Sequence, residues 1–118
     1  LLNVSAAFHS NLMKTAEEKM LNYINKIKFN SSNINIISNY SAESSNNNSI
    51  ISQNLSKQMS NKVRWVESIK TLENLKEETI IEIGPSKVLS GLIKRINKKF
   101  KLINFNSIND IENIKNAT

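Results

Sequence analysis

Cysteine is absent from the 118-residue sequence, and histidine occurs only once. The lack of Cys excludes a disulfide scaffold, a Cys-ligated zinc site and a thiol nucleophile. A single His excludes any metal centre that needs two imidazoles from the same chain. We therefore expect no metal site built from this chain alone.

Glycine, proline and long apolar runs are also scarce. Two Gly and one Pro exclude collagen-like and linker-like sequences. No apolar run approaches the roughly 20 residues that cross a bilayer, so we expect no membrane partner. The chain starts Leu1-Leu2-Asn3 without Met or a basic-then-apolar leader, which predicts a fragment without a signal peptide. We expect the protein to be cytoplasmic.

Apolar residues make up 39% of the chain, enough to form a packed core. The sequence has 20 Asn, 17 Ile and 14 Lys against two Arg, a bias typical of A/T-rich coding sequences. We therefore expect codon bias to contribute much of the net charge of +6. A pI near 9.7 would permit nucleic-acid binding, but the lysines are scattered and aromatics are few, so we expect no nucleic-acid partner.

Hydrophobic periodicity predicts helices alternating with short β-branched strands. We expect helices at 12–27 (capped by Ser10), 51–59, 65–75, 88–96 (capped by Ser86) and 108–114, strands at 34–37, 79–83 and 101–105, and a surface loop at 40–49. This order predicts an α/β fold whose parallel sheet is covered on both faces. The pattern contains no internal repeat and no clear domain boundary.

Two local features carry both a structural and a chemical interpretation. His9 follows a short apolar segment and precedes a helix, so it is either a hydrogen-bonded packing residue or a general base at a strand edge. Gly84-Pro85-Ser86-Lys87 lies between a strand and a helix. A segment with one Gly is not a P-loop. A tight strand-to-helix turn is therefore a simpler interpretation of these residues than a phosphate-binding site.

Three separated segments are informative when they are taken in order. They are Ser5-Ala6-Ala7-Phe8-His9-Ser10-Asn11-Leu12-Met13-Lys14, then Lys57-Gln58-Met59 with Val63-Arg64-Trp65, and then the stretch from Glu82 to Ile96. In order and spacing they resemble the active-site histidine segment, the next block and the C-terminal signature of the malonyl-CoA:acyl-carrier-protein transacylase family. The resemblance covers about residues 1–100 and implies that 1–118 is the C-terminal segment of a malonyl/acyl transferase domain.

The resemblance implies an S-malonyltransferase of fatty acid biosynthesis that moves malonyl from malonyl-CoA to the phosphopantetheine thiol of acyl carrier protein. His9 would be the base of a ping-pong Ser-His mechanism. A main-chain carbonyl near Gln58 would orient its ring, and Phe8 would lie against the acyl pocket and favour malonyl over methylmalonyl. No cofactor is implied, because CoA and phosphopantetheine enter only as substrates.

The same resemblance implies that the nucleophilic Ser, the oxyanion hole and the Arg that binds the malonyl carboxylate lie upstream of Leu1. The chain would then be the C-terminal part of a large α/β-hydrolase-like subdomain, without the ferredoxin-like small subdomain. We expect this fragment alone to be inactive, with an exposed apolar face, and the complete enzyme to be monomeric.

The helix after Gly84-Pro85 carries basic residues. At 100° per residue, Lys87, Lys94 and Lys98 would share the face opposite the apolar one. They are either a solvated stripe or a surface that attracts the acidic carrier protein. Two alternatives to the malonyltransferase stay open: the acyltransferase domain of a polyketide synthase, and a non-catalytic binding module that retains the fold.

Overall fold

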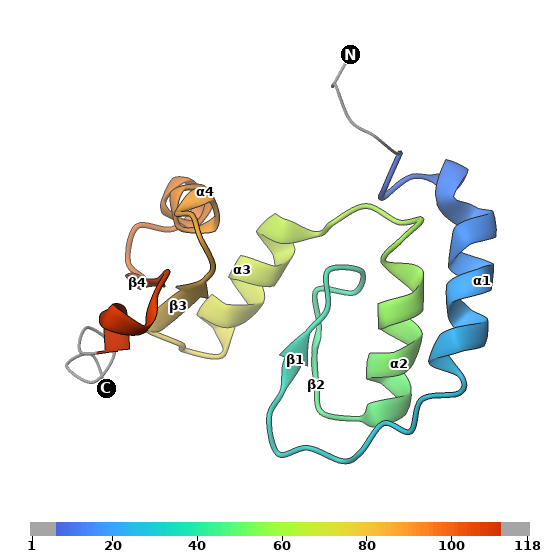
Figure 1. Ribbon diagram of the computed structural model, residues 1–118. Helices are drawn as coiled ribbons and strands as arrows, with labels where there is room; N and C mark the ends of the chain where they lie inside the picture. The colour runs from blue at the N-terminus through green and yellow to red at the C-terminus, as the bar shows by residue number, and fades with distance from the viewer. Residues whose placement is uncertain (1–6, 112–118) are drawn as a thin grey trace. The chain divides into compact units, whose positions relative to one another are not determined.

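The computed structural model describes residues 7–111, which form two compact units (Figure 1). The first unit ends at Thr71 and the second begins at Leu72. No helix within residues 7–111 is long and apolar enough to cross a lipid bilayer. Both units consist of short helices and short strands, and one pair of strands is parallel. The prediction of an α/β fold is therefore confirmed.

The first unit opens with a 3-10 turn, η1 (Asn11–Met13), that continues into α1 (Lys14–Ile24). α1 lies beside α2 (Asn48–Lys57), and Ile24 is buried (Figure 1). Ser10 occupies the N-cap position, but its hydroxyl donates to the Ala7 carbonyl oxygen at 2.7 Å instead of capping the helix. Ser10 is therefore at the predicted position, but the predicted hydrogen bond from a helix amide to its hydroxyl is not formed, because the hydroxyl bonds within a local turn.

Two very short strands form a hairpin where one buried strand was expected. β1 (Ile36–Ile37) pairs antiparallel with β2 (Ser44–Ser45), with Ile36 opposite Ser45. The prediction of a parallel strand over 34–37 is wrong, and the predicted loop at 40–49 contains β2 and the start of α2. Three Ser hydroxyls in this polar stretch each accept a hydrogen bond from the backbone N–H of the residue two positions later. The pairs are Ser38 with Tyr40, Ser41 with Glu43, and Ser45 with Asn47.

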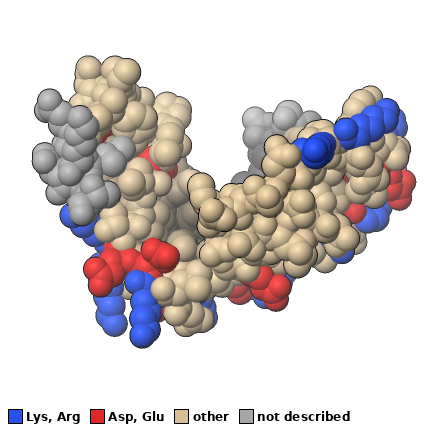
Figure 2. Space-filling model, turned by 90° about the horizontal axis from the view of Figure 1, so that it is seen from below, with Lys and Arg blue, Asp and Glu red and all other residues tan. Residues whose placement is uncertain are grey.

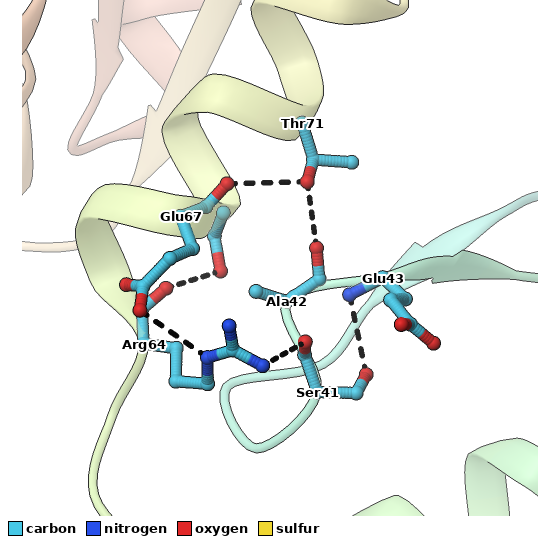
Figure 3. A network of polar contacts seen from close by, with 7 residues as sticks. Ser41, Ala42, Glu43, Arg64, Glu67 and Thr71 are labelled. Atoms are coloured by element: carbon cyan, nitrogen blue, oxygen red, sulfur yellow. Dashed lines mark hydrogen bonds and ion pairs between the residues drawn. The ribbon is translucent and has the colours of Figure 1, made fainter.

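Polar contacts fasten the hairpin to α3 (Trp65–Asn74) (Figure 3). Arg64 Nη1 donates to the Ser41 carbonyl oxygen at 3.0 Å, and its Nε lies 3.3 Å from Glu67 Oε1. Thr71 Oγ1 donates to the carbonyl oxygen of Ala42 at 2.7 Å. Ala42 is buried and has a φ of 60°, so a non-glycine residue is held here in the left-handed region.

The second unit starts with the C-terminal turn of α3. Lys76 takes a φ of 61°, its N–H donates to the Glu73 carbonyl, and the N–H of Glu77 donates to the Leu72 carbonyl. This pair of hydrogen bonds is a Schellman motif, in which the left-handed residue is usually Gly. The motif ends α3 without a glycine in the sequence.

A β-α-β unit follows, with the strand bounds that the sequence predicts. β3 (Thr79–Ile83) pairs in parallel with β4 (Lys101–Phe105), Thr79 opposite Lys101 and Ile83 opposite Phe105. α4 (Val88–Ile96) connects the two strands, and its Ile93 is buried. Gly84 ends β3 with a φ of 151°, a conformation that L side chains rarely adopt.

Glu82 closes the N-terminus of α4 from within β3. Its carboxylate accepts the amides of Leu89 at 3.0 Å and Ser90 at 2.8 Å, and also binds Asn104 Nδ2 at 3.0 Å. The predicted cap by Ser86 is wrong, because Lys87 is the N-cap residue and makes no side-chain cap bond. A carboxylate from the preceding strand supplies the acceptors instead.

Large apolar side chains of β3 and α4 are exposed. Ile83 is 77% exposed and Val88 is 62% exposed. Strand alternation puts Ile81 and Ile83 on the sheet face opposite Glu82. The last element of the described chain is η2 (Ile108–Asp110), where Ser107 and Asp110 form a capping box. The rest of the helix predicted through Ile114 lies outside the described residues.

Candidate active site around His9

His9 lies in a tight turn directly before η1, in the first unit. Its φ of 62° is in the left-handed region, which costs an ordinary L-residue free energy. The backbone N–H of His9 donates to the carbonyl oxygen of Met59 at 2.8 Å. A residue 50 positions away therefore holds the backbone of His9 in this conformation.

The imidazole is held by the neighbouring peptide group. His9 Nδ1 lies 2.8 Å from the carbonyl oxygen of Gln58. Because a carbonyl oxygen can only accept, Nδ1 must carry the proton of this hydrogen bond. In the neutral ring, Nε2 then carries the free lone pair. The ring is exposed, and no described residue forms a hydrogen bond with Nε2.

Phe8 lies next to this ring. The two ring centroids are 6.5 Å apart with an interplanar angle of 53°, and Phe8 is 55% exposed. The structure thus brings together the three residues that the resemblance singles out, His9, Phe8 and the carbonyl of Gln58. Their roles in catalysis and specificity stay predictions.

A buried carboxylate anchors the segment that holds His9. Glu17 of α1 is only 6% exposed, and Ser60, 4% exposed, donates its hydroxyl to Glu17 Oε2. Lys14 forms an ion pair with Glu17 Oε1. Burial by itself would raise the pKa of Glu17, but hydrogen bonds from Lys14 and Ser60 outweigh burial, and the pKa is lowered.

Sequence reasoning missed Glu17, although a signal was present. Position 17 falls on the apolar stripe of the predicted helix, four residues after Met13 and three before Met20. A carboxylate at such a position must be paired once it is buried. The partner itself, Ser60, could not be identified from the helix pattern.

The predicted lysine surface belongs to the second unit. Only Lys94 lies within α4, because Lys87 is its N-cap and Lys98 follows its last residue, Ile96. The helical argument therefore does not place the three side chains on one face. In Figure 2 the blue basic side chains on the face drawn lie in separate groups. Their role in attracting a partner stays a prediction.

Across residues 7–111, no three His, Asp or Glu side chains come together in a way that could hold a metal ion. The chemistry that the described site offers is proton transfer. A ring with its Nδ1 proton engaged and its Nε2 lone pair exposed can accept a proton from a nearby hydroxyl or thiol. The sequence contains no Gly-x-Ser-x-Gly motif that would supply such a nucleophile.

No protein-family model matches the sequence. Curated relatives do match, and they are malonyl CoA-acyl carrier protein transacylases. The protein from Bacillus subtilis (strain 168) is 40% identical over 116 residues, covering 98% of this chain and 36% of that protein. The protein from Staphylococcus aureus (strain MSSA476) is 38% identical over 111 residues, 94% of this chain and 36% of that protein.

Solved structures that are similar to this chain are also malonyltransferases. The acyl-carrier-protein-S-malonyltransferase from Bartonella henselae superposes with a TM-score of 0.91 at 34% identity, over 98% of this chain and 37% of that chain. A malonyl-transacylase in complex with a type II polyketide synthase acyl-carrier protein superposes with a TM-score of 0.91 at 27% identity, over 99% and 38%. By sequence and by fold, the chain is similar to malonyl CoA-acyl carrier protein transacylases, and it spans about a third of the length of these relatives.

Proposed function

We propose that this chain is the histidine-bearing part of a malonyl CoA-acyl carrier protein transacylase and that His9 is its general base. The observation that carries the proposal is the 2.8 Å contact between His9 Nδ1 and the Gln58 carbonyl oxygen. That contact leaves Nε2 as the basic atom of the neutral ring. The matches to named transacylases over nearly the whole chain support the assignment.

The proposed reaction is a ping-pong acyl transfer in which His9 moves the protons. Nε2 takes the hydroxyl proton as a serine from the rest of the protein attacks the malonyl thioester carbonyl. The C–S bond breaks, and the imidazolium returns the proton to the leaving CoA thiolate. In the second half, Nε2 takes the proton from the phosphopantetheine thiol, which attacks the acyl-serine ester, and the serine oxygen regains that proton.

The Gln58 carbonyl does the part of the work that a triad carboxylate does elsewhere. By accepting the hydrogen bond from Nδ1–H, it fixes both the tautomer and the ring plane. A neutral carbonyl stabilises the imidazolium less than a carboxylate would. The sequence is consistent with this arrangement, because no Asp occurs before Asp110.

The rest of the proposal concerns the complete protein. The chain would belong to the large α/β-hydrolase-like subdomain of a monomeric, cytoplasmic enzyme, with malonyl-CoA and acyl carrier protein as substrates and no bound cofactor. Serine, oxyanion hole and malonate-binding Arg would come from the other two thirds of the protein. The chain alone should form no malonyl adduct with malonyl-CoA by mass spectrometry, and a stoichiometric adduct would contradict this proposal.

The test of His9 is its replacement in the complete enzyme. His9→Ala should lower malonyl transfer by ~10²–10⁴-fold, the usual contribution of a positioned acid-base group. Circular dichroism should show an unchanged fold, because the ring is exposed. Transfer activity within a few-fold of wild type would show that the ring is structural and would remove the proposed mechanism.

A role in polyketide synthesis is the second candidate, because one structural neighbour is a malonyl-transacylase bound to a polyketide synthase carrier protein. Both candidates use the same chemistry and differ in the acceptor. Initial rates of malonyl transfer to a fatty-acid carrier protein and to a polyketide carrier protein, measured side by side, distinguish them. A preference for the polyketide carrier would favour the second candidate.

A further inference from the structure

Glu17 is a buried carboxylate on a helix that contributes no group to the His9 ring itself. Removing a carboxylate from water is costly unless its oxygens are fully engaged. Both oxygens of Glu17 are engaged: Oε1 by Lys14 and Oε2 by the Ser60 hydroxyl. The adjacent Glu18 is exposed, as an acidic residue on a surface helix ordinarily is.

Ser60 connects this carboxylate to the peptide groups that hold His9. It directly follows Gln58 and Met59, whose carbonyl oxygens accept the His9 ring and backbone N–H, each at 2.8 Å. Asn61 Nδ2 donates to Ser60 Oγ at 3.2 Å and to the Lys57 carbonyl at 2.7 Å, closing the turn after α2. One short segment, 58–61, therefore touches α1 on one side and His9 on the other.

We propose that Glu17 is a positioning residue for His9, acting through Ser60. By fixing Ser60 to α1, Glu17 holds the 58–59 carbonyls where they keep the His9 ring in one tautomer and one orientation. This inference rests on the proposed function of His9, and it adds a residue outside the three segments that resemble the family. The positions of the Gln58 and Met59 carbonyl oxygens matter, because a displacement of about 1 Å at a catalytic group can lower the rate on the order of 10²-fold.

The conformation of His9 makes it dependent on this support. A left-handed φ in a residue with a Cβ persists only when surrounding contacts over-determine it. Within the described residues, His9 forms hydrogen bonds with Gln58 and Met59, and its ring lies near that of Phe8. Loosening the 58–60 segment would let the backbone of His9 relax toward a negative φ, and the ring would leave the Gln58 carbonyl.

The test compares four variants in the complete enzyme: Glu17→Ala, Glu17→Gln, Ser60→Ala and the control Glu18→Ala. Ser60→Ala is the safeguard if Glu17→Ala folds poorly, because it removes the same contact with a small change in volume. Glu17→Gln retains one oxygen that can accept the Ser60 hydroxyl, while the charge and the oxygen that pairs with Lys14 are lost. Steady-state malonyl transfer gives kcat and KM, and selective 15N-histidine labelling reports the tautomer of the His9 ring, assigned by its loss in His9→Ala.

We expect Glu17→Ala and Ser60→Ala to lower kcat by ~10-fold or more, with KM for malonyl-CoA changed less than about 2-fold. The His9 15N signals should shift toward a mixture of tautomers. Glu17→Gln should recover most of the lost kcat, and Glu18→Ala should match wild type. Wild-type kcat and an unchanged tautomer in both Ser60→Ala and Glu17→Ala would overturn the proposal. If instead His9→Ala retains activity, the proposed function of His9 is wrong, and the positioning role of Glu17 is wrong with it.

Discussion

The Glu82 carboxylate accepts the backbone N–H of Ser90 at 2.8 Å, and its hydroxyl as well, so that one strand side chain caps the helix that follows it. Glu82 as a whole is 7% exposed. Amides at a helix N-terminus carry partial positive charge, which makes a carboxylate the favoured partner there. β3, α4 and β4 are thus joined at one group, since Asn104 of β4 also donates to it.

Replacing Glu82 with Ala should destabilise the second unit. The change leaves the amides of Leu89 and Ser90 without their acceptor, and Ser90 is buried. We expect the midpoint of thermal unfolding, followed by circular dichroism, to fall by roughly 4–8 °C. Glu78→Ala, an exposed position just before β3, is the matched control and should change it little. Equal effects of the two changes would mean that the carboxylate is not acting as a cap.

Stability should fall in acid because of the same group. Hydrogen bonds from the Ser90 side chain, and then from the backbone amides, lower the pKa of Glu82 below its ordinary value of 4.5. A depressed pKa in the folded state stabilises the protein above about pH 4.5, and that contribution is lost as the pH falls through the folded pKa. Unfolding midpoints between pH 7 and pH 3 should drop less steeply for Glu82→Gln than for wild type. Parallel curves would contradict this assignment.

Lys76→Gly should stabilise the protein. Lys76 holds a φ of 61° at the end of α3, where Gly bears no steric cost from a Cβ. The expected gain is about 1 kcal/mol in the free energy of unfolding, measured by urea titration. Lys76→Ala removes the charge and retains the Cβ, so it should be close to wild type. A gain shared by both variants would indicate relief of charge repulsion rather than of backbone strain.

Phe8→Ser should relax the choice of acyl group in the complete enzyme. Phe8 lies beside the His9 ring and is more than half exposed, so a smaller residue leaves room for an α-methyl substituent without disturbing a core. We expect the ratio of kcat/KM for methylmalonyl-CoA to that for malonyl-CoA to rise several-fold. Phe8→Leu, which keeps most of the bulk, should stay near wild type. An unchanged ratio in Phe8→Ser would remove Phe8 from the specificity determinants.

Reversing the charge of Lys94 and Lys98 should weaken recognition of an acidic carrier protein. With both residues replaced by Glu, the apparent KM for carrier protein should rise several-fold at low salt, because opposite charge mainly speeds association. Added salt should shrink the effect, and kcat at saturation should not move. Lys19→Glu in α1 is an exposed basic control. A carrier-protein KM that stays constant at low salt would leave these lysines with a solvation role only.

The elements predicted best from sequence are those whose signals are local. The β-branched runs at 79–83 and 101–105 give β3 and β4 their bounds, since Gly84-Pro85 stops the first run. The β1–β2 hairpin has two residues per strand, too short for a periodic pattern, and tertiary contacts from α3 stabilise it. The pairing of Glu17 with Ser60 could not be predicted either, because 43 residues separate them.

The two acceptors of His9 are consecutive carbonyls, which makes the length of the segment directly after α2 a strict requirement. Successive residues at the end of a helix lie about 100° apart around its axis. An insertion or deletion of one residue between Lys57 and Ser60 would turn a different carbonyl toward the ring and another toward the backbone N–H. Length changes should therefore be tolerated in the Asn/Ser-rich stretch at 30–35, which carries no contact to His9, and rejected in the four residues that follow α2.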